Sequence, residues 1–105
     1  MLLPFLSVGA VGLVSMAGHL VGDELGRVIA HAVGGEPGQA RAVFRSVLPA
    51  VDLICGTGNG ALRSKLALHL LGLIPSAAMR LPQLPADERE TEEVRAALAV
   101  AFGHR

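Results

Sequence analysis

The chain has 105 residues, of which 51% are hydrophobic and 17% charged, and its formal net charge at pH 7 is zero. Without an excess of basic residues it has no stripe that could neutralise several phosphates, which argues against nucleic acid as a partner. A short chain needs many polar residues to cover its surface, so this apolar excess predicts hydrophobic faces that meet something else.

The single cysteine, Cys55, excludes an intramolecular disulfide and indicates a reducing compartment. A lone cysteine is more often a small buried hydrophobe than a nucleophile, so we interpret Cys55 as a core residue. We therefore expect a cytoplasmic protein.

Residues 2–22 contain no Lys, Arg, Asp or Glu, and a run of this length could span a bilayer. However, Pro4 and four glycines interrupt the run, and no basic region precedes it, as a signal peptide would require. We do not expect a membrane segment, but a small membrane or secreted protein that uses residues 2–22 is kept as an alternative.

The start of the chain predicts a partial helix, a turn and one short strand. Residues 2–8 are almost entirely apolar, Pro4 suits a first helical turn, and Gly9 ends the run. We expect Gly9 or Gly12 to adopt a turn conformation that is open to glycine. The β-branched run at residues 11–15 then predicts a fully buried strand. A single strand cannot pair its own backbone groups, so its neighbours come from elsewhere or the segment is not a strand.

Four helices are predicted after this strand. Apolar residues at helical spacing indicate a helix over residues 18–33, and Glu-Pro at residues 36–37 opens a second one. A very apolar third helix covers residues 61–71 and ends at Gly72. After a connector marked by prolines, the last helix begins in the acidic run 87–93, which we interpret as a solvated helix start that complements the helix dipole.

The loop at residues 56–60 contains three glycines, with Lys65 downstream, and could suggest a phosphate cradle. The Walker spacing is absent, because no Lys-Ser/Thr pair follows a final glycine and no strand precedes the loop. We interpret the loop as a plain turn between two helices.

Residue chemistry alone names no enzyme. His19, His31, His69 and His104 lack the spacing of metal ligands, and we predict neither a metal nor a cofactor. His19 follows the predicted strand, where a barrel-type active-site end would lie, but we favour a structural role for it. Lys65 is the only lysine, and no neighbour would clearly desolvate its amine as a Schiff base requires.

Three motifs, in order and together covering nearly the whole chain, resemble one family. Residues 7–22 resemble the last barrel strand of the 4-hydroxy-tetrahydrodipicolinate synthases, formerly dihydrodipicolinate synthases, with their glycine turn, a G-V-[IV]-S-V pattern and a small-residue helix start. Residues 65–73 are similar to the family's K-x-A-L-x-x-L-G-L helix, and residues 80–82 with Pro85 match its R-L-P connector. N-acetylneuraminate lyase shares this fold, and the loop at residues 56–60 departs from the family's E-P-N-P type of connection.

This resemblance implies a mainly α fold, the C-terminal fragment of a (β/α)8 TIM barrel with one short strand and appended helices. Residues 1–35 would be the last helix–strand–helix portion of the barrel, and residues 36–105 the C-terminal helical extension. A complete barrel of this type has about 250 residues. The partner implied is therefore the missing N-terminal part of a barrel, or further copies of the chain.

The resemblance also implies an activity, in which pyruvate is held as a lysine Schiff base and condenses with aspartate semialdehyde in lysine biosynthesis. The family's Schiff-base lysine and proton-relay residues belong to earlier strands; this chain has no tyrosine, and Lys65 matches a helix lysine. We therefore expect the isolated chain to be inactive and to meet pyruvate only in a complete barrel. Val14 alone carries over to the substrate site, through a backbone carbonyl that lines the pyruvate pocket. A helical assembly or binding module derived from the barrel is the alternative.

Overall fold

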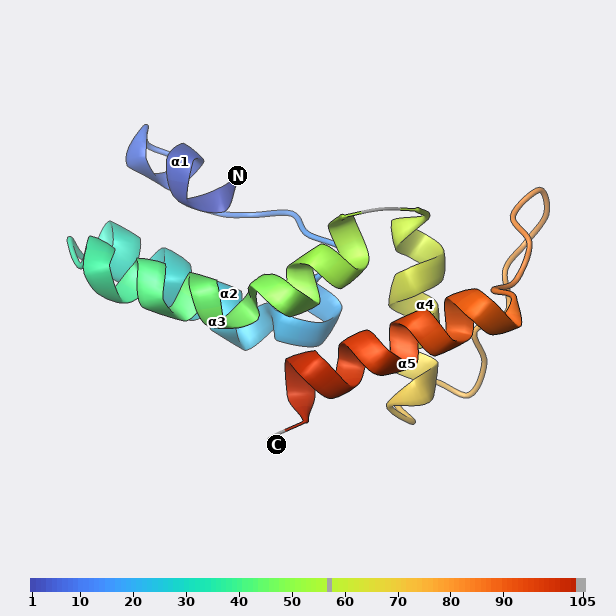
Figure 1. Cartoon of the computed structure of the whole chain (residues 1–105). Helices are drawn as coiled ribbons and strands as arrows, with labels where there is room; N and C mark the ends of the chain where they lie inside the picture. The colour runs from blue at the N-terminus through green and yellow to red at the C-terminus, as the bar shows by residue number, and fades with distance from the viewer. Residues whose placement is uncertain (57, 104–105) are drawn as a thin grey trace.

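The structure is a computed structural model that describes residues 1–56 and 58–103, and within these ranges it contains helices and no strand (Figure 1). The element bounds are Leu2–Ser7 for α1, Gly18–Val33 for α2, Pro37–Cys55 for α3, Gly60–Leu70 for α4 and Glu88–Phe102 for α5. The mainly helical architecture predicted from the sequence is therefore confirmed, with bounds that agree within one or two residues.

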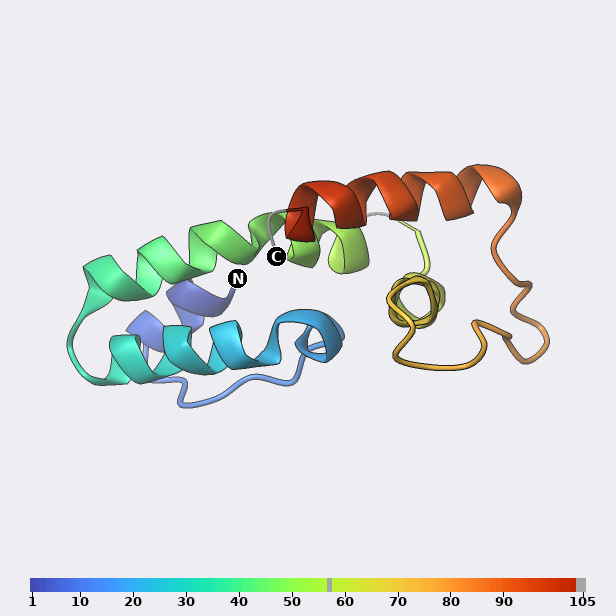
Figure 2. The same ribbon diagram turned by 90° about the horizontal axis from the view of Figure 1, so that it is seen from below.

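Helices α2 and α3 lie side by side as an antiparallel hairpin (Figures 1 and 2). The turn between them depends on Gly35, whose φ of +77° is a left-handed conformation that favours glycine. Because a carboxylate only accepts hydrogen bonds, the Nδ1–H of His31 donates to Glu36 Oε2, across 2.5 Å. Pro37 then occupies the first turn of α3, where its missing N–H costs nothing.

Helices α4 and α5 each begin at a side chain that caps free backbone amides. Asn59 Oδ1 accepts from the N–H groups of Ala61 and Leu62, at 3.0 and 3.2 Å. Asp87 Oδ1 accepts from the N–H of Glu90 at 2.7 Å. Such caps stabilise a helix by about 1 kcal/mol each, so both starting points are encoded locally.

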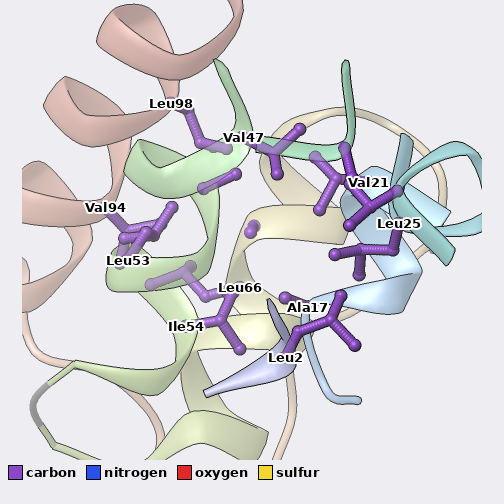
Figure 3. Close-up of a cluster of buried hydrophobic side chains, with 14 residues drawn as sticks. Leu2, Ala17, Val21, Leu25, Val47, Leu53, Ile54, Leu66, Val94 and Leu98 are labelled. Atoms are coloured by element: carbon purple, nitrogen blue, oxygen red, sulfur yellow. The ribbon is translucent and has the colours of Figure 1, made fainter. Parts of the chain in front are cut away.

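Both halves of the chain contribute to one hydrophobic core, and Figure 3 shows most of it. Ile54, Val21, Val28 and Val94 are the largest of its fully buried side chains. The core joins α5 to the α2–α3 hairpin, and α5 packs against both α3 and α4. The core draws on residues 1–35 and on the described residues that follow them.

The segment that was predicted as a strand, residues 11–15, is extended but belongs to no strand, and this prediction is corrected. It runs beside α2 in the opposite direction before the chain turns back into that helix (Figure 2). A strand is defined by hydrogen bonds to a neighbour, and the described part of this chain supplies no second extended segment against it.

None of the described helices combines the length and the apolar character that a membrane crossing requires. Within residues 2–22, the helical structure is divided between α1 and the start of α2 by Gly9 and the extended segment.

The chain exposes more surface than a compact monomer of its size. Its surface area is 6791 Å², whereas about 5,500 Å² is typical for a folded monomer of 10.8 kDa. Its radius of gyration is 14.9 Å, compared with about 13 Å for a compact domain of this length. The chain is therefore less compact than a typical domain of its length.

Gly9 is the residue of the first turn for which the backbone demands glycine. Its φ is +103°, whereas Gly12 is outside the left-handed region. We expect Gly9→Ala to lower the free energy of unfolding by about 1 kcal/mol, because alanine is strained at positive φ. Gly12→Ala is the matched control: a Cβ at that position would meet nothing within 4 Å, and a change below about 0.5 kcal/mol is expected. Urea unfolding measures both, and equal losses would contradict this assignment.

Candidate functional site

The extended segment offers an unpaired backbone and exposed apolar side chains. Val11 is 82% exposed and Val14 is 103% exposed, although both are β-branched residues that favour sheets. Among the described residues, no hydrogen bond involves the backbone of residues 11–14. Free N–H and C=O groups along an apolar strand-like segment are a template for pairing with another strand.

A cavity of about 550 Å³ lies beside the carboxyl end of this segment. Val14, Met16 and His19 line one part of it, and Cys55 lines it from the end of α3. Leu13 and Ser15 of the segment also line it, and α1, α2 and α3 add apolar side chains, among them Leu2, Leu25, Phe44 and Val51. The cavity is thus a mainly hydrophobic hollow whose polar lining residues are Ser15, His19 and Cys55.

The cavity brings together three residues that the sequence analysis treated separately, namely Val14, His19 and Cys55. Val14 was considered because of the family resemblance, and His19 because of its position after the predicted strand. Cys55 was interpreted as buried, and this was wrong: the last turn of α3 leaves its thiol exposed. Met16 was not predicted, because a methionine in an apolar run has no signal of its own.

Lys65 does not line this cavity. Its Nζ donates to the backbone carbonyl of Ala78, which ties α4 to the connector before α5. His69 Nδ1 contacts the carbonyl oxygen of Ile74 at 3.2 Å, so it too holds the connector. These contacts give both side chains a structural role.

No group of three or more His, Cys, Asp or Glu side chains in the described ranges could hold a metal ion. The prediction for His104 lies outside the described residues, as does Thr57 within the glycine-containing loop. The rest of that loop connects α3 to α4 as a turn, with Gly58 at a φ of +77°.

Arg63 is a mostly buried charge that the sequence analysis missed. Its Nη1 donates to the carbonyl of Leu53 at 3.2 Å. Its Nε lies 3.8 Å from Glu90 Oε1, and its Nη2 lies 3.7 Å from Glu93 Oε2. The Arg63 side chain is only 13% exposed, so it joins the end of α3 and the start of α5 to α4. The acidic run 87–93 is therefore not simply a solvated helix start, because two of its members face this guanidinium.

The sequence profile of the Dihydrodipicolinate synthetase family matches residues 1–101, which is nearly the whole chain. The chain belongs to this family. Two curated relatives, both described as 4-hydroxy-tetrahydrodipicolinate synthase, are similar to it in sequence. The protein of Kineococcus radiotolerans is 38% identical over 99 residues, which are 94% of this chain and 32% of the relative. The protein of Bifidobacterium longum is 32% identical over 99 residues, which are 94% of this chain and 33% of the relative.

The family resemblance drawn from three sequence motifs is thereby confirmed. The chain spans about a third of the length of the curated relatives that it matches.

Proposed function

We propose that this chain forms the C-terminal part of a 4-hydroxy-tetrahydrodipicolinate synthase-like barrel, and that it is inactive until the remainder of the barrel pairs with it. The observation that carries this proposal is the extended segment at residues 11–14, with free backbone groups and exposed valines. A segment of this kind becomes the last strand of a parallel barrel when neighbouring strands are supplied. The unpaired thiol of Cys55 supports a reducing, cytoplasmic location.

In the completed barrel, pyruvate is held as a Schiff base on a lysine outside this chain and condenses with aspartate semialdehyde. The backbone carbonyl of Val14 lines the pyruvate pocket. Lys65 is not the nucleophile, since its Nζ already donates to the Ala78 carbonyl and it does not line the cavity. Catalysis requires a lysine amine that is free and uncharged at the pocket.

Borohydride trapping tests this proposal. A lysine amine adds to the pyruvate ketone with loss of water, and hydride then reduces the imine to a stable secondary amine whose mass is measured. We expect no adduct on the isolated chain. We expect an adduct when the chain is combined with the other two thirds of the Kineococcus radiotolerans relative, on a lysine of that protein. An adduct on Lys65 of the isolated chain would overturn the proposal.

Two valine substitutions separate a barrel strand from a surface segment. Val14→Asp and Val33→Asp both replace a valine that is exposed in this chain, at 103% and 67%. If the segment at residues 11–14 enters a barrel, a carboxylate at position 14 becomes buried and abolishes the adduct in the complex. Val33→Asp, at the end of α2, should leave adduct formation unchanged. Equal behaviour of the two variants would contradict the assignment of a barrel strand.

The surplus surface favours one alternative, a helical module that assembles with its own copies. Sedimentation of the isolated chain distinguishes the two functions. A discrete oligomer that does not take up the complementary part of the relative would support the assembly module, whereas exchange into a mixed complex supports the barrel.

A further inference from the structure

The C-terminal helices reach the carboxyl end of the extended segment through a close contact between Met16 and Gly60. A Cβ atom at position 60 would lie 2.7 Å from Met16 Cε and 2.9 Å from its Sδ. The same Cβ would lie 3.0 Å from the backbone oxygen of Ile54, which cannot move aside as a flexible side chain can. Glycine at position 60 therefore allows the turn before α4 to rest directly on Met16.

The end of α3 and the end of the extended segment border the same cavity. Met16 and Val14 line the cavity from the segment, while Cys55 lines it from the last turn of α3. In β/α barrels, substrates bind at the carboxyl ends of the strands. The carboxyl end of this segment is the end that borders the cavity, so α3 supplies one wall at the substrate side of a completed barrel.

We infer that Met16 and Cys55 are specificity-determining residues that set how long an aldehyde the completed barrel accepts. This inference rests on the proposed function, because the cavity becomes a substrate cleft only when the other strands are present. Both side chains line the cavity, so shortening the long Met16 would enlarge it and replacing the small Cys55 by a bulky residue would narrow it. A change of one methylene in such an apolar pocket alters kcat/KM by about tenfold or more.

The test compares two acceptors in the complex with the other two thirds of the Kineococcus radiotolerans relative. These acceptors are aspartate semialdehyde and a homologue that is longer by one methylene group. The quantity measured is the kcat/KM for the longer acceptor divided by the kcat/KM for aspartate semialdehyde. We expect Met16→Ala to raise this ratio by about tenfold and Cys55→Phe to lower it by a similar factor. The two variants must shift the ratio in opposite directions, because general damage to the fold would lower kcat/KM for both acceptors and would not produce opposite shifts.

Two controls keep the test decisive. Met16→Leu conserves side-chain volume and should keep the ratio within about twofold of the parent. Met79→Ala removes a methionine that does not line the cavity and should not change the ratio. If the pyruvate adduct forms in all variants but the ratios do not move in opposite directions, this inference is wrong while the proposed function stands. If the parent complex forms no adduct, the proposed function fails and this inference fails with it.

Discussion

Replacing Ile54 by alanine is expected to lower the free energy of unfolding by about 4 kcal/mol. Ile54 is 1% exposed and lies in the core near Leu53 and Leu66 (Figure 3). Truncation of a buried isoleucine loses the transfer free energy of three carbon atoms and leaves a cavity that the surrounding helices fill only partly. A chain of this length has a total stability of roughly 5–15 kcal/mol, so the loss is a large fraction of the whole.

The matched control is Val100→Ala on the outer face of α5, where the valine is 74% exposed. Its effect should stay within about 0.5 kcal/mol. Thermal unfolding followed by circular dichroism measures both variants, and Ile54→Ala should lower the melting temperature by more than roughly 15 °C. Similar melting temperatures for the two variants would show that the core does not join α3 to α4 and α5 in solution.

Replacing Arg63 by methionine is expected to cost about 2 kcal/mol of stability. The substitution keeps an apolar stem of similar length but removes the hydrogen bond to the Leu53 carbonyl. It also leaves Glu90, whose side chain is 23% exposed, without its cationic neighbour. Hydrogen bonds that involve a charged group contribute about 1.5–3 kcal/mol, more than an ordinary surface ion pair.

Arg95→Met is the matched control, because Arg95 also lies near a glutamate but is 59% exposed. Its pair with Glu92, at 3.4 Å, is screened by solvent and should contribute less than about 0.5 kcal/mol. A double-mutant cycle between Arg63→Met and Glu90→Gln provides a second check. The two changes should be non-additive by at least about 0.5 kcal/mol. Strict additivity, or equal losses for Arg63→Met and Arg95→Met, would contradict the role assigned to Arg63.

The helices were predictable because their signals are local. Asp87 caps α5 through a contact three residues away, and Pro37 and Gly72 mark the start of α3 and the end of α4 through backbone geometry. Each of these features depends on neighbours within one helical turn. The family, too, was predictable, since it depends on the order of short motifs and not on their contacts in space.

The strand and the surroundings of single side chains were not predictable in this way. Residues 11–15 have strand-like composition, but a strand needs a neighbouring strand to pair with, and the described part of this chain supplies none. The exposure of Cys55 depends on how α3 ends beside the cavity, and an apolar sequence context cannot reveal that. The role of Arg63 depends on Leu53 and Glu90, which are distant in sequence and come together only when three helices pack.

The amino-acid sequence by itself determined the helices, the glycine turn and the family, because periodicity, caps and motif order are properties of neighbouring residues. The tertiary structure alone decided that residues 1–35 share one core with the described residues that follow them, that Gly60 brings α4 onto Met16, and that Cys55 and Val14 border one cavity. These relations arise from contacts between residues far apart in the chain. Packing selects such contacts by shape and by the burial of apolar surface, and no local pattern records which partners will meet.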